Sequence, residues 1–236
     1  MIIPNLSEDV VRNALREALN VYDNARNDDR ENKLDFYEGY TEQHIKKFFG
    51  SESLRQVPIF NQNLTRRICS IRAMSYRRPP RMRSDARYEK HIDRSGLNMV
   101  RRQLERITFL LGTMAFHCRW SERNLRVEYD LIPFFDVLFL ENDAEPVAVM
   151  YPIQNHGNAR DNDLSYAVWT ADRPGFPGQH YILDANGSKI KVNSENANPY
   201  GILPVVFVHR QPPIRDFYVA GADDVIRADL SLSVGM

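Results

Sequence analysis

Apolar positions near the start of the chain recur with the period of an amphipathic helix. Ser7 is a good N-cap residue, and the two acidic residues after it suit the positive end of a helix dipole. The apolar residues that follow repeat at i+4 in two series, Val11, Leu15 and Leu19, and Val10, Ala14 and Ala18. We expect a helix from Ser7 to about residue 22, followed by a polar connector over residues 23–32.

Two shorter helices are predicted after this connector. One covers about residues 30–38 and ends at Gly39, because glycine readily adopts the left-handed conformation that closes helices. The next covers residues 42–49, with Thr41 as its N-cap and Gly50 after its last turn.

Two further helices complete the first half of the chain. The fourth begins at Asn61 or Asn63 and ends before Pro79-Pro80, because proline lacks the amide hydrogen and restricts the residue before it. One face of it carries Leu64, Ile68, Ile71 and Ser75. The fifth helix is the clearest, with apolar residues at steps of three and four: Leu97, Val100, Leu104, Ile107, Leu111, Met114 and Cys118.

From about Leu125 the pattern changes to short apolar runs separated by turn residues. Residues 137–153 are typical of a strand, a turn and a strand, and residues 163–172 predict another strand. Within residues 180–192, Asn186-Gly187 stands between two alternating runs, which predicts a hairpin with a type I′ turn.

The last part of the chain adds one strand and one helix. Residues 201–210 predict a strand buried on both faces, and residues 223–234 predict the start of a helix. The fold class is therefore α+β, with helices first and an antiparallel β region after them. The corresponding ranges are a helical region at 1–124, a β region at 125–218 and the start of a C-terminal helix at 219–236.

Basic and acidic residues number 31 each, but they are unevenly distributed. Residues 1–60 hold 8 basic and 11 acidic side chains, residues 61–130 hold 16 and 7, and residues 131–236 hold 7 and 13. The basic middle segment has three possible binding partners: nucleic acid, the acidic part of a neighbouring copy, and the acidic part of its own chain. The candidates for nucleic-acid or inter-subunit contact are Arg66, Arg67, Arg72, Arg77, Arg78, Arg81, Arg83, Arg87, Arg101 and Arg102.

Composition excludes several classes of protein. A mean hydropathy of −0.49 and short apolar runs indicate a soluble chain with no membrane partner, and the N-terminus lacks the features of a signal peptide. Cys69 and Cys118 are 49 positions apart without CxxC spacing, so we expect buried free thiols in a reducing compartment, with Cys118 in the core of the fifth helix. The six histidines are scattered and no phosphate-binding glycine loop occurs, so we expect no metal and no cofactor.

Three pairs of acidic residues could in principle hold a metal ion for nuclease chemistry: Asp28-Asp29, Asp161 with Asp163, and Asp223-Asp224. Each pair is better explained as a helix start or a polar turn, because acidic residues favour the first turn of a helix. Nothing in these residues specifies catalysis, and we expect a protein that is not an enzyme.

Five segments stand out in order along nearly the whole chain. They are KLDFYEGY (33–40), NLTRRICSIRAMSYRRPP (63–80), RRQLERITFLLGTMAFHCRW (101–120), LRVEYDLIPFFDVLFLENDAEPVAVMYPI (125–153) and NPYGILPVVFVHRQPPIRDFYVAGADDVIRADLSLSV (198–234). Their order and spacing resemble those of the portal proteins of tailed bacteriophages, and the last segment is the most specific. The resemblance covers the N-terminal, wing-like portion of a portal, and the helix that begins at Asp223 would lead into the stem, clip and tunnel loop.

This resemblance implies a structural protein of the virion. Portals form a ring, usually of twelve subunits, at one vertex of the capsid, and double-stranded DNA passes through the ring during packaging and ejection. The partners implied are further copies of the chain, double-stranded DNA, the terminase large subunit, and capsid, scaffold and tail or adaptor proteins. Assembly would take place in the cytoplasm of the bacterial host.

Two alternatives to the portal interpretation stay open at this point. A stand-alone module could bind double-stranded DNA through residues 66–106 without base specificity, since phosphate contacts carry no sequence information. A metal-dependent nuclease would show Mg²⁺-dependent DNA cleavage that is lost when Asp161 and Asp163, or Asp223 and Asp224, are changed.

Overall fold

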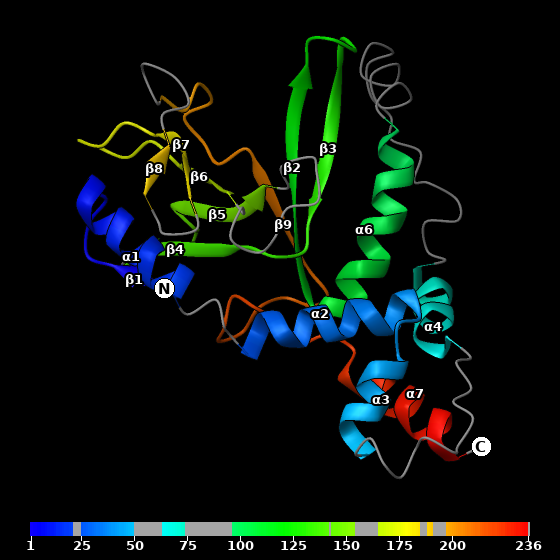
Figure 1. Ribbon diagram of the computed structural model, residues 1–236. Helices are drawn as coiled ribbons and strands as arrows, with labels where there is room; N and C mark the ends of the chain where they lie inside the picture. The colour runs from blue at the N-terminus through cyan, green and yellow to red at the C-terminus, as the bar shows by residue number, and fades with distance from the viewer. Residues whose placement is uncertain are drawn as a thin grey trace. The chain divides into compact units, whose positions relative to one another are not determined.

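The computed structural model has the α+β fold that the sequence predicts, with N-terminal helices, mixed and antiparallel sheets and a C-terminal helix (Figure 1). It describes residues 1–20, 25–49, 63–73, 96–141, 143–153, 165–184, 188–190 and 197–235. The helices are α1 (Glu8–Asn20), α2 (Ala25–Glu38), α3 (Glu42–Phe49), α4 (Leu64–Arg72), α6 (Leu97–Leu111) and α7 (Asp223–Gly235). The strands are β1 (Ile2–Ile3), β2 (Thr113–Ser121), β3 (Arg126–Ile132), β4 (Asp136–Leu140), β5 (Ala148–Ile153), β6 (Ser165–Thr170), β7 (His180–Leu183), β8 (Lys189–Ile190) and β9 (Val205–His209).

Contacts divide the chain into two compact units that are each built from several segments. Unit 1 contains Met1–Asn24, Ala115–Cys118 and Phe134–Val206, and unit 2 contains Ala25–Met114, Arg119–Pro133 and Phe207–Met236. These units cross the ranges 1–124, 125–218 and 219–236 that the sequence pattern predicts, because α1 packs with strands and α7 packs with helices.

Unit 1 is built on a six-stranded sheet with the order β1-β4-β5-β6-β7-β8. The β1 strand pairs with β4 in parallel, with Ile2 opposite Phe139, and the sequence pattern did not predict it. All other pairs in this sheet are antiparallel. Helix α1 packs on one face of the sheet through Val11 and Leu15, which contribute to a core shared with Val168 of β6.

Several local predictions for unit 1 are confirmed. Helix α1 starts directly after Ser7, whose carbonyl accepts the first helical hydrogen bond from the amide of Val11 (3.0 Å). The strand–turn–strand at 137–153 is the antiparallel pair β4 and β5. The hairpin at 180–192 is the pair β7 and β8, although its Asn186-Gly187 turn lies outside the described residues.

Helix α2 in unit 2 corrects the expected polar connector, because it starts at Ala25 and not near residue 30. Most of the described side chains that it buries are polar or charged: Asn27 is 7% exposed, Arg30 is 3% exposed and Lys33 is 5% exposed, and Phe36 is the one apolar residue among them. The Arg30 guanidinium donates to the backbone carbonyls of Thr113 (3.0 Å) and Pro133. A helix that buries charged residues shows no apolar stripe, which is why the pattern missed its first turns.

The end of α2 and the bounds of α3 are as predicted, whereas two details of α3 and α4 are corrected. Helix α2 ends at Glu38, directly before Gly39 with its φ of 94°, and α3 begins at Glu42. The Thr41 hydroxyl is buried and finds no hydrogen-bond partner within the described part of the chain, so it does not act as the expected cap. Helix α4 begins after Asn63, whose side chain accepts from the Arg66 amide (3.2 Å), but Ile71 on its expected apolar face is 62% exposed.

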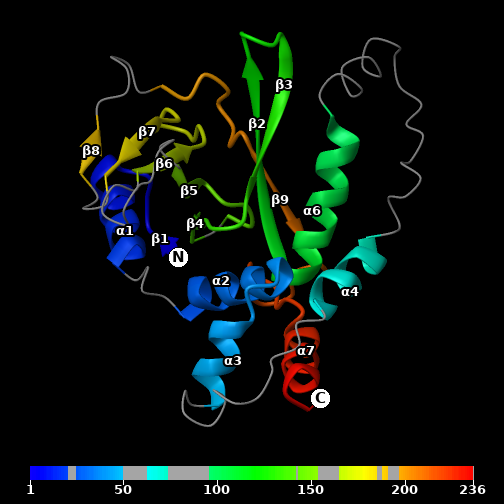
Figure 2. The same ribbon diagram turned by 45° about the vertical axis from the view of Figure 1, so that its right-hand side comes forward.

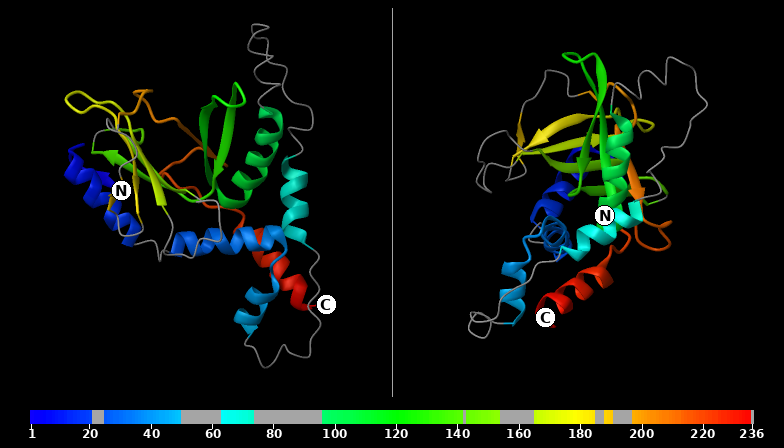
Figure 3. Two further views of the ribbon diagram at one scale, coloured as in Figure 1. Left: turned by 45° about the horizontal axis from the view of Figure 1, so that its top comes forward. Right: turned by 90° about the vertical axis from the view of Figure 1, so that its right-hand side faces the viewer.

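Helix α4 instead buries Thr65, Cys69 and Ala73, which are small enough for close packing against neighbouring helices. It contacts both α6 and α7, and its place beside them is visible in Figure 3. Helix α6 runs along β3 (Figure 1, Figure 2).

The expected fifth helix is too long, and this is the largest correction. Helix α6 ends at Leu111, and residues Thr113–Ser121 form strand β2. Met114 is buried as predicted, whereas Cys118 is only half-buried, and both lie on a strand. The cause is Gly112, which has a φ of 84° that stops the helix, while the positions 114 and 118 fit a period of two as well as a period of four.

The strand β9 is also less buried than expected. Val205 is buried, but Val206 is 46% exposed, so burial on both faces was wrong. Strand β9 lies at an edge of a three-stranded sheet with the order β3-β2-β9. Because an edge strand has a neighbouring strand on one side only, β9 is partly exposed although its sequence is nearly continuously apolar.

Candidate functional site

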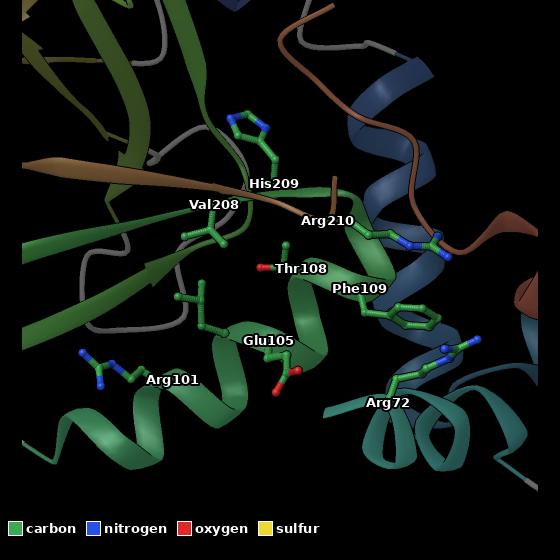
Figure 4. Close-up of a pocket in the computed structure, with 9 residues that line it drawn as sticks. Arg72, Arg101, Glu105, Thr108, Phe109, Val208, His209 and Arg210 are labelled. Carbon is green, nitrogen blue, oxygen red and sulfur yellow. The ribbon is translucent and has the colours of Figure 1, made fainter. Parts of the chain in front are cut away.

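A pocket of about 480 Å³ in unit 2 is lined by three arginines, two of which lie beside one aromatic ring. We call it the arginine pocket. It is lined by Arg72 at the end of α4, by Arg101, Leu104, Glu105, Thr108 and Phe109 of α6, and by Val208, His209 and Arg210 at the end of β9 (Figure 4). Its walls therefore combine positive charge with apolar surface.

Phe109 organises two of these arginines. The guanidinium carbon of Arg210 lies 4.4 Å from the centre of the Phe109 ring, and that of Arg72 lies 5.9 Å from it. Figure 4 draws the ring between the two side chains. A guanidinium near an aromatic face gains cation–π attraction of about 0.5–1 kcal/mol at exposed sites, while its N–H groups stay available for other acceptors.

Backbone contacts fix the position of Arg210. Its amide donates to the carbonyl of Gly112 (2.8 Å), and its Nη1 donates to the carbonyl of Gly221 (3.0 Å). The end of β9 is thereby attached to the residue that terminates α6.

Two polar groups of the pocket are neutral near pH 7. Burial lowers the pKa of His209 below its ordinary value, and its Nδ1 lies 3.2 Å from the Thr113 hydroxyl. Thr108 is 5% exposed, and its hydroxyl has no hydrogen-bond partner among the residues that the structure describes. In Figure 4 the Thr108 side chain points from α6 towards Val208.

The structure brings only some of the predicted arginines together. Arg72 and Arg101 line the pocket, whereas Arg66, Arg67 and Arg102 are exposed on α4 and α6 outside it. Arg77, Arg78, Arg81, Arg83 and Arg87 lie outside the described residues. Sequence reasoning missed Arg210 and His209, for which the only available signal was their position directly after an apolar run.

Part of the basic middle segment pairs within the chain. Arg119 on β2 contacts Glu128 (2.8 Å) and Asp130 (2.8 Å) on β3. A hydrogen bond from the Asn124 side chain, with help from nearby arginines, lowers the pKa of Glu128. These arginines therefore have carboxylate partners of their own and are weaker candidates for contact with another molecule.

Ion pairs of the buried Lys33 and hydrogen bonds of the buried Asp229 connect helices of unit 2. The Lys33 ammonium lies 2.6 Å from Asp29 and 2.6 Å from Asp223, the first residue of α7. Asp229 of α7 is 1% exposed and accepts from the Thr65 amide (2.9 Å) and hydroxyl (2.6 Å) at the start of α4. The first backbone amides of a helix have no acceptor within the helix, and the Asp229 carboxylate accepts from one of them.

Two glycines allow the end of α6 and the chain before α7 to touch through their backbones. A Cβ on Gly112 would lie 1.9 Å from the carbonyl oxygen of Val219, and a Cβ on Gly221 would lie 2.1 Å from that of Leu110. The Val219 amide also donates to the Thr113 hydroxyl (2.8 Å). Only glycine fits at these two positions.

Unit 1 contains a separate cluster of aromatic and histidine side chains. The Trp169 indole donates to the Tyr151 hydroxyl (3.1 Å), which lies 3.3 Å from His117 Nδ1, and His180 stacks on Trp169 with ring centres 3.7 Å apart. Burial and the neighbouring His117 lower the pKa of His180. Trp169 is a buried core residue, whereas Trp120 is 50% exposed.

The acidic residues that the structure describes do not converge on a metal site. Asp29 and Asp223 are both bound to Lys33, while Asp161 and Asp163 lie outside the described residues. Across the described ranges, no group of three or more His, Cys, Asp or Glu residues is arranged to hold a metal ion.

No helix in the described part of the chain has the length and apolar character needed to cross a membrane. No protein-family model matches the chain, and no curated protein matches it. The functional argument therefore depends on the residues and on the contacts between them.

Proposed function

We propose that the chain is a structural subunit of a bacteriophage portal ring and not an enzyme. In this role, copies of the chain surround the channel through which double-stranded DNA is packaged and ejected at the capsid vertex. The ring also provides the docking platform for the terminase large subunit and later for tail or adaptor proteins. It contacts capsid and scaffold proteins and is assembled in the cytoplasm of the bacterial host.

One observation carries the proposal: four of the five segments that resemble portals contact one another in the structure. The segment 198–234 contacts 33–40 through Asp223 and Lys33, and it contacts 63–80 through Asp229 and Thr65. It also packs on the segment 101–120, where Gly112 and Gly221 allow close backbone contact. Motifs that are far apart in sequence thus form one connected set of contacts in unit 2, which supports treating them as parts of one family pattern.

The distribution of charge supports assembly through contacts between copies. A closed ring needs two different surfaces on each subunit, because each copy contacts its neighbours head to tail. The basic segment 61–130 and the acidic segment 131–236 provide opposite charges for such contacts. Arg67 and Arg102 are exposed and belong to the basic segment, so they are available to a carboxylate of the next copy or to DNA phosphates.

Light scattering of the purified chain at low and high salt tests the proposal. We expect a mass of many subunits at low salt, because opposite charges attract more strongly when they are less screened. Arg67→Glu should lower that mass, and Lys47→Glu, which reverses an exposed charge on α3 outside the basic segment, should leave it unchanged. A single-chain mass at both salt concentrations would overturn the proposal.

The alternative is a stand-alone module that binds double-stranded DNA. Exposed arginines on α4 and α6 favour it, since phosphate contacts by arginine dominate non-specific DNA affinity. It predicts a monomer or dimer whose DNA affinity falls steeply and linearly on a log–log plot against salt. A large ring with weak DNA affinity would exclude this alternative.

A further inference from the structure

We propose that the arginine pocket is a binding site for a phosphate group, presented either by a free phosphate compound or by the backbone of a nucleic acid. This site does not depend on ring assembly, because all of the residues that line it belong to unit 2 of one chain. The argument rests on the charge of the pocket, on one buried hydroxyl and on the shape of the walls.

The charge of the pocket favours an anion with several acceptor oxygens. Three arginines and one glutamate, Glu105, line the pocket. His209 is neutral near pH 7 and adds no charge. Guanidinium groups pair in a bidentate manner with phosphate, and a phosphate offers more acceptor oxygens than a carboxylate. Arg72 and Arg210 are exposed, so an anion can reach them from solvent.

Thr108 supplies the independent observation that points to a ligand. Its hydroxyl is buried at the wall of the pocket without a hydrogen-bond partner among the described residues, although it lies on a helix where it could bond to a carbonyl. A buried hydroxyl without a partner costs roughly 1–3 kcal/mol, so such groups are rare in stable proteins. Because Thr108 lines the pocket, a small rotation of its side chain would let a phosphate oxygen accept from this hydroxyl and remove the cost.

The shape and the fixed position of the walls fit a bound group. A volume of about 480 Å³ lies within the range typical of small-molecule sites. Phe109 holds Arg72 and Arg210 on either side of its ring, and the carbonyl of Gly221 anchors Arg210 further. Side chains restrained before binding lose less conformational entropy when the ligand arrives.

Isothermal titration calorimetry and thermal unfolding with inorganic phosphate test the site, with chloride at matched ionic strength as the reference. We expect phosphate to bind and to raise the Tm more than chloride does. Thr108→Val should weaken phosphate binding about tenfold, because one hydrogen bond to a charged group is lost, while the Tm without phosphate stays equal or rises. Arg210→Gln and Arg72→Gln should also weaken binding, whereas the matched control Arg102→Gln, on α6 but outside the pocket, should not.

A short DNA duplex separates the two sources of phosphate. If the duplex displaces inorganic phosphate and Thr108→Val lowers duplex affinity, the group comes from a nucleic-acid backbone. If the duplex does not compete, the ligand is a small phosphate compound. Equal effects of phosphate and chloride on the wild-type Tm with no binding heat, or equal weakening by Thr108→Val and Arg102→Gln, would overturn the proposal.

The same variants distinguish this site from the portal proposal. Thr108→Val removes only a buried hydroxyl, so ring assembly measured by light scattering should not change. If Thr108→Val loses phosphate binding and still forms rings, the result supports the phosphate site and leaves the portal proposal unaffected. If the chain is a monomer that still binds phosphate, the portal proposal is contradicted and the phosphate site is retained.

Discussion

Replacing Gly112 by alanine tests the close contact between the end of α6 and the chain before α7. The added Cβ would lie 1.9 Å from the Val219 carbonyl oxygen and 2.6 Å from the Ala220 carbonyl carbon, whereas real Cβ atoms essentially never approach other atoms below 3.0 Å. Both neighbours are backbone atoms, so the segment at 219–220 must move. The backbone of Gly112 itself, with a φ of 84°, also disfavours any residue with a side chain.

The expected cost has three parts. The left-handed backbone costs about 1–2 kcal/mol for an L-residue, and overpacking costs about 1–3 kcal/mol. Displacing residues 219–220 also stretches the hydrogen bonds from the Val219 amide to Thr113 (2.8 Å) and from the Ala222 amide to Leu110 (2.9 Å), each worth about 1 kcal/mol. We therefore expect a loss of about 4 kcal/mol in the free energy of unfolding.

Gly96→Ala is the matched control, because Gly96 stands at the other end of α6 with a φ of 68°, and a Cβ added there would have no atom within 4 Å. It should cost only the backbone term of about 1–2 kcal/mol. Thermal unfolding followed by circular dichroism should then show Gly112→Ala melting about 5–10 °C below Gly96→Ala, since 1 kcal/mol shifts the Tm of a chain of this size by about 2–4 °C. Faster hydrogen exchange at the Val219 amide should accompany the loss. Equal Tm values for the two variants would refute the reasoning.

Three further predictions concern buried polar and titratable groups. Asp229→Ala should lower the free energy of unfolding by about 3 kcal/mol, because the Thr65 amide loses its acceptor, and a urea denaturation midpoint equal to that of the wild type would contradict this. Burial raises the pKa of Cys69 to about 11, so this thiol should react with an aromatic disulfide reagent at least about tenfold more slowly than the half-buried Cys118; equal rates would show that Cys69 is accessible. The pKa of His180 lies below its ordinary 6.5, so its contribution to stability is present above pH 6.5 and is lost as pH falls through the lowered value. The Tm should therefore fall at acidic pH, and less so in His180→Phe; an identical pH dependence in that variant would argue against the assignment.

The parts of the fold that sequence predicts well are those where a local signal and the packing agree. Ser7 before an i+4 apolar series predicts α1, and an Asn-Gly pair between alternating runs predicts the hairpin of β7 and β8. Helix α2 fails this test, because three of the four buried residues described in it, Asn27, Arg30 and Lys33, are polar or charged. Arg30 and Lys33 have partners that are distant in sequence, Thr113 and Asp223. A helix face whose buried residues are mostly polar or charged shows no apolar repeat, so hydrophobic periodicity does not predict it.

The boundary between α6 and β2 shows a different limit. Met114 and Cys118 fit the helical series and also the period of a strand, so periodicity alone leaves the choice open. Gly112 ends the helix where its backbone comes into close contact with Val219, a residue that is distant in sequence. Such a contact exists only in three dimensions.

The candidate site was predictable in its residue type but not in its geometry. The concentration of arginines between residues 61 and 130 indicated a basic surface, and Arg72 and Arg101 do line the arginine pocket. Arg210 joins them from the acidic segment 131–236 and lies against Phe109, so charge counting did not assign it to the basic surface. The unpartnered hydroxyl of Thr108, buried among the described residues, has no sequence signal at all.

Negative-stain electron microscopy of the purified chain at low salt tests the central claim most directly. The account predicts closed rings with a central opening and about twelve copies, and Arg67→Glu should reduce the fraction of particles in rings while Lys47→Glu does not. Particles of single-chain size at every salt concentration would contradict the claim that this chain is a portal subunit.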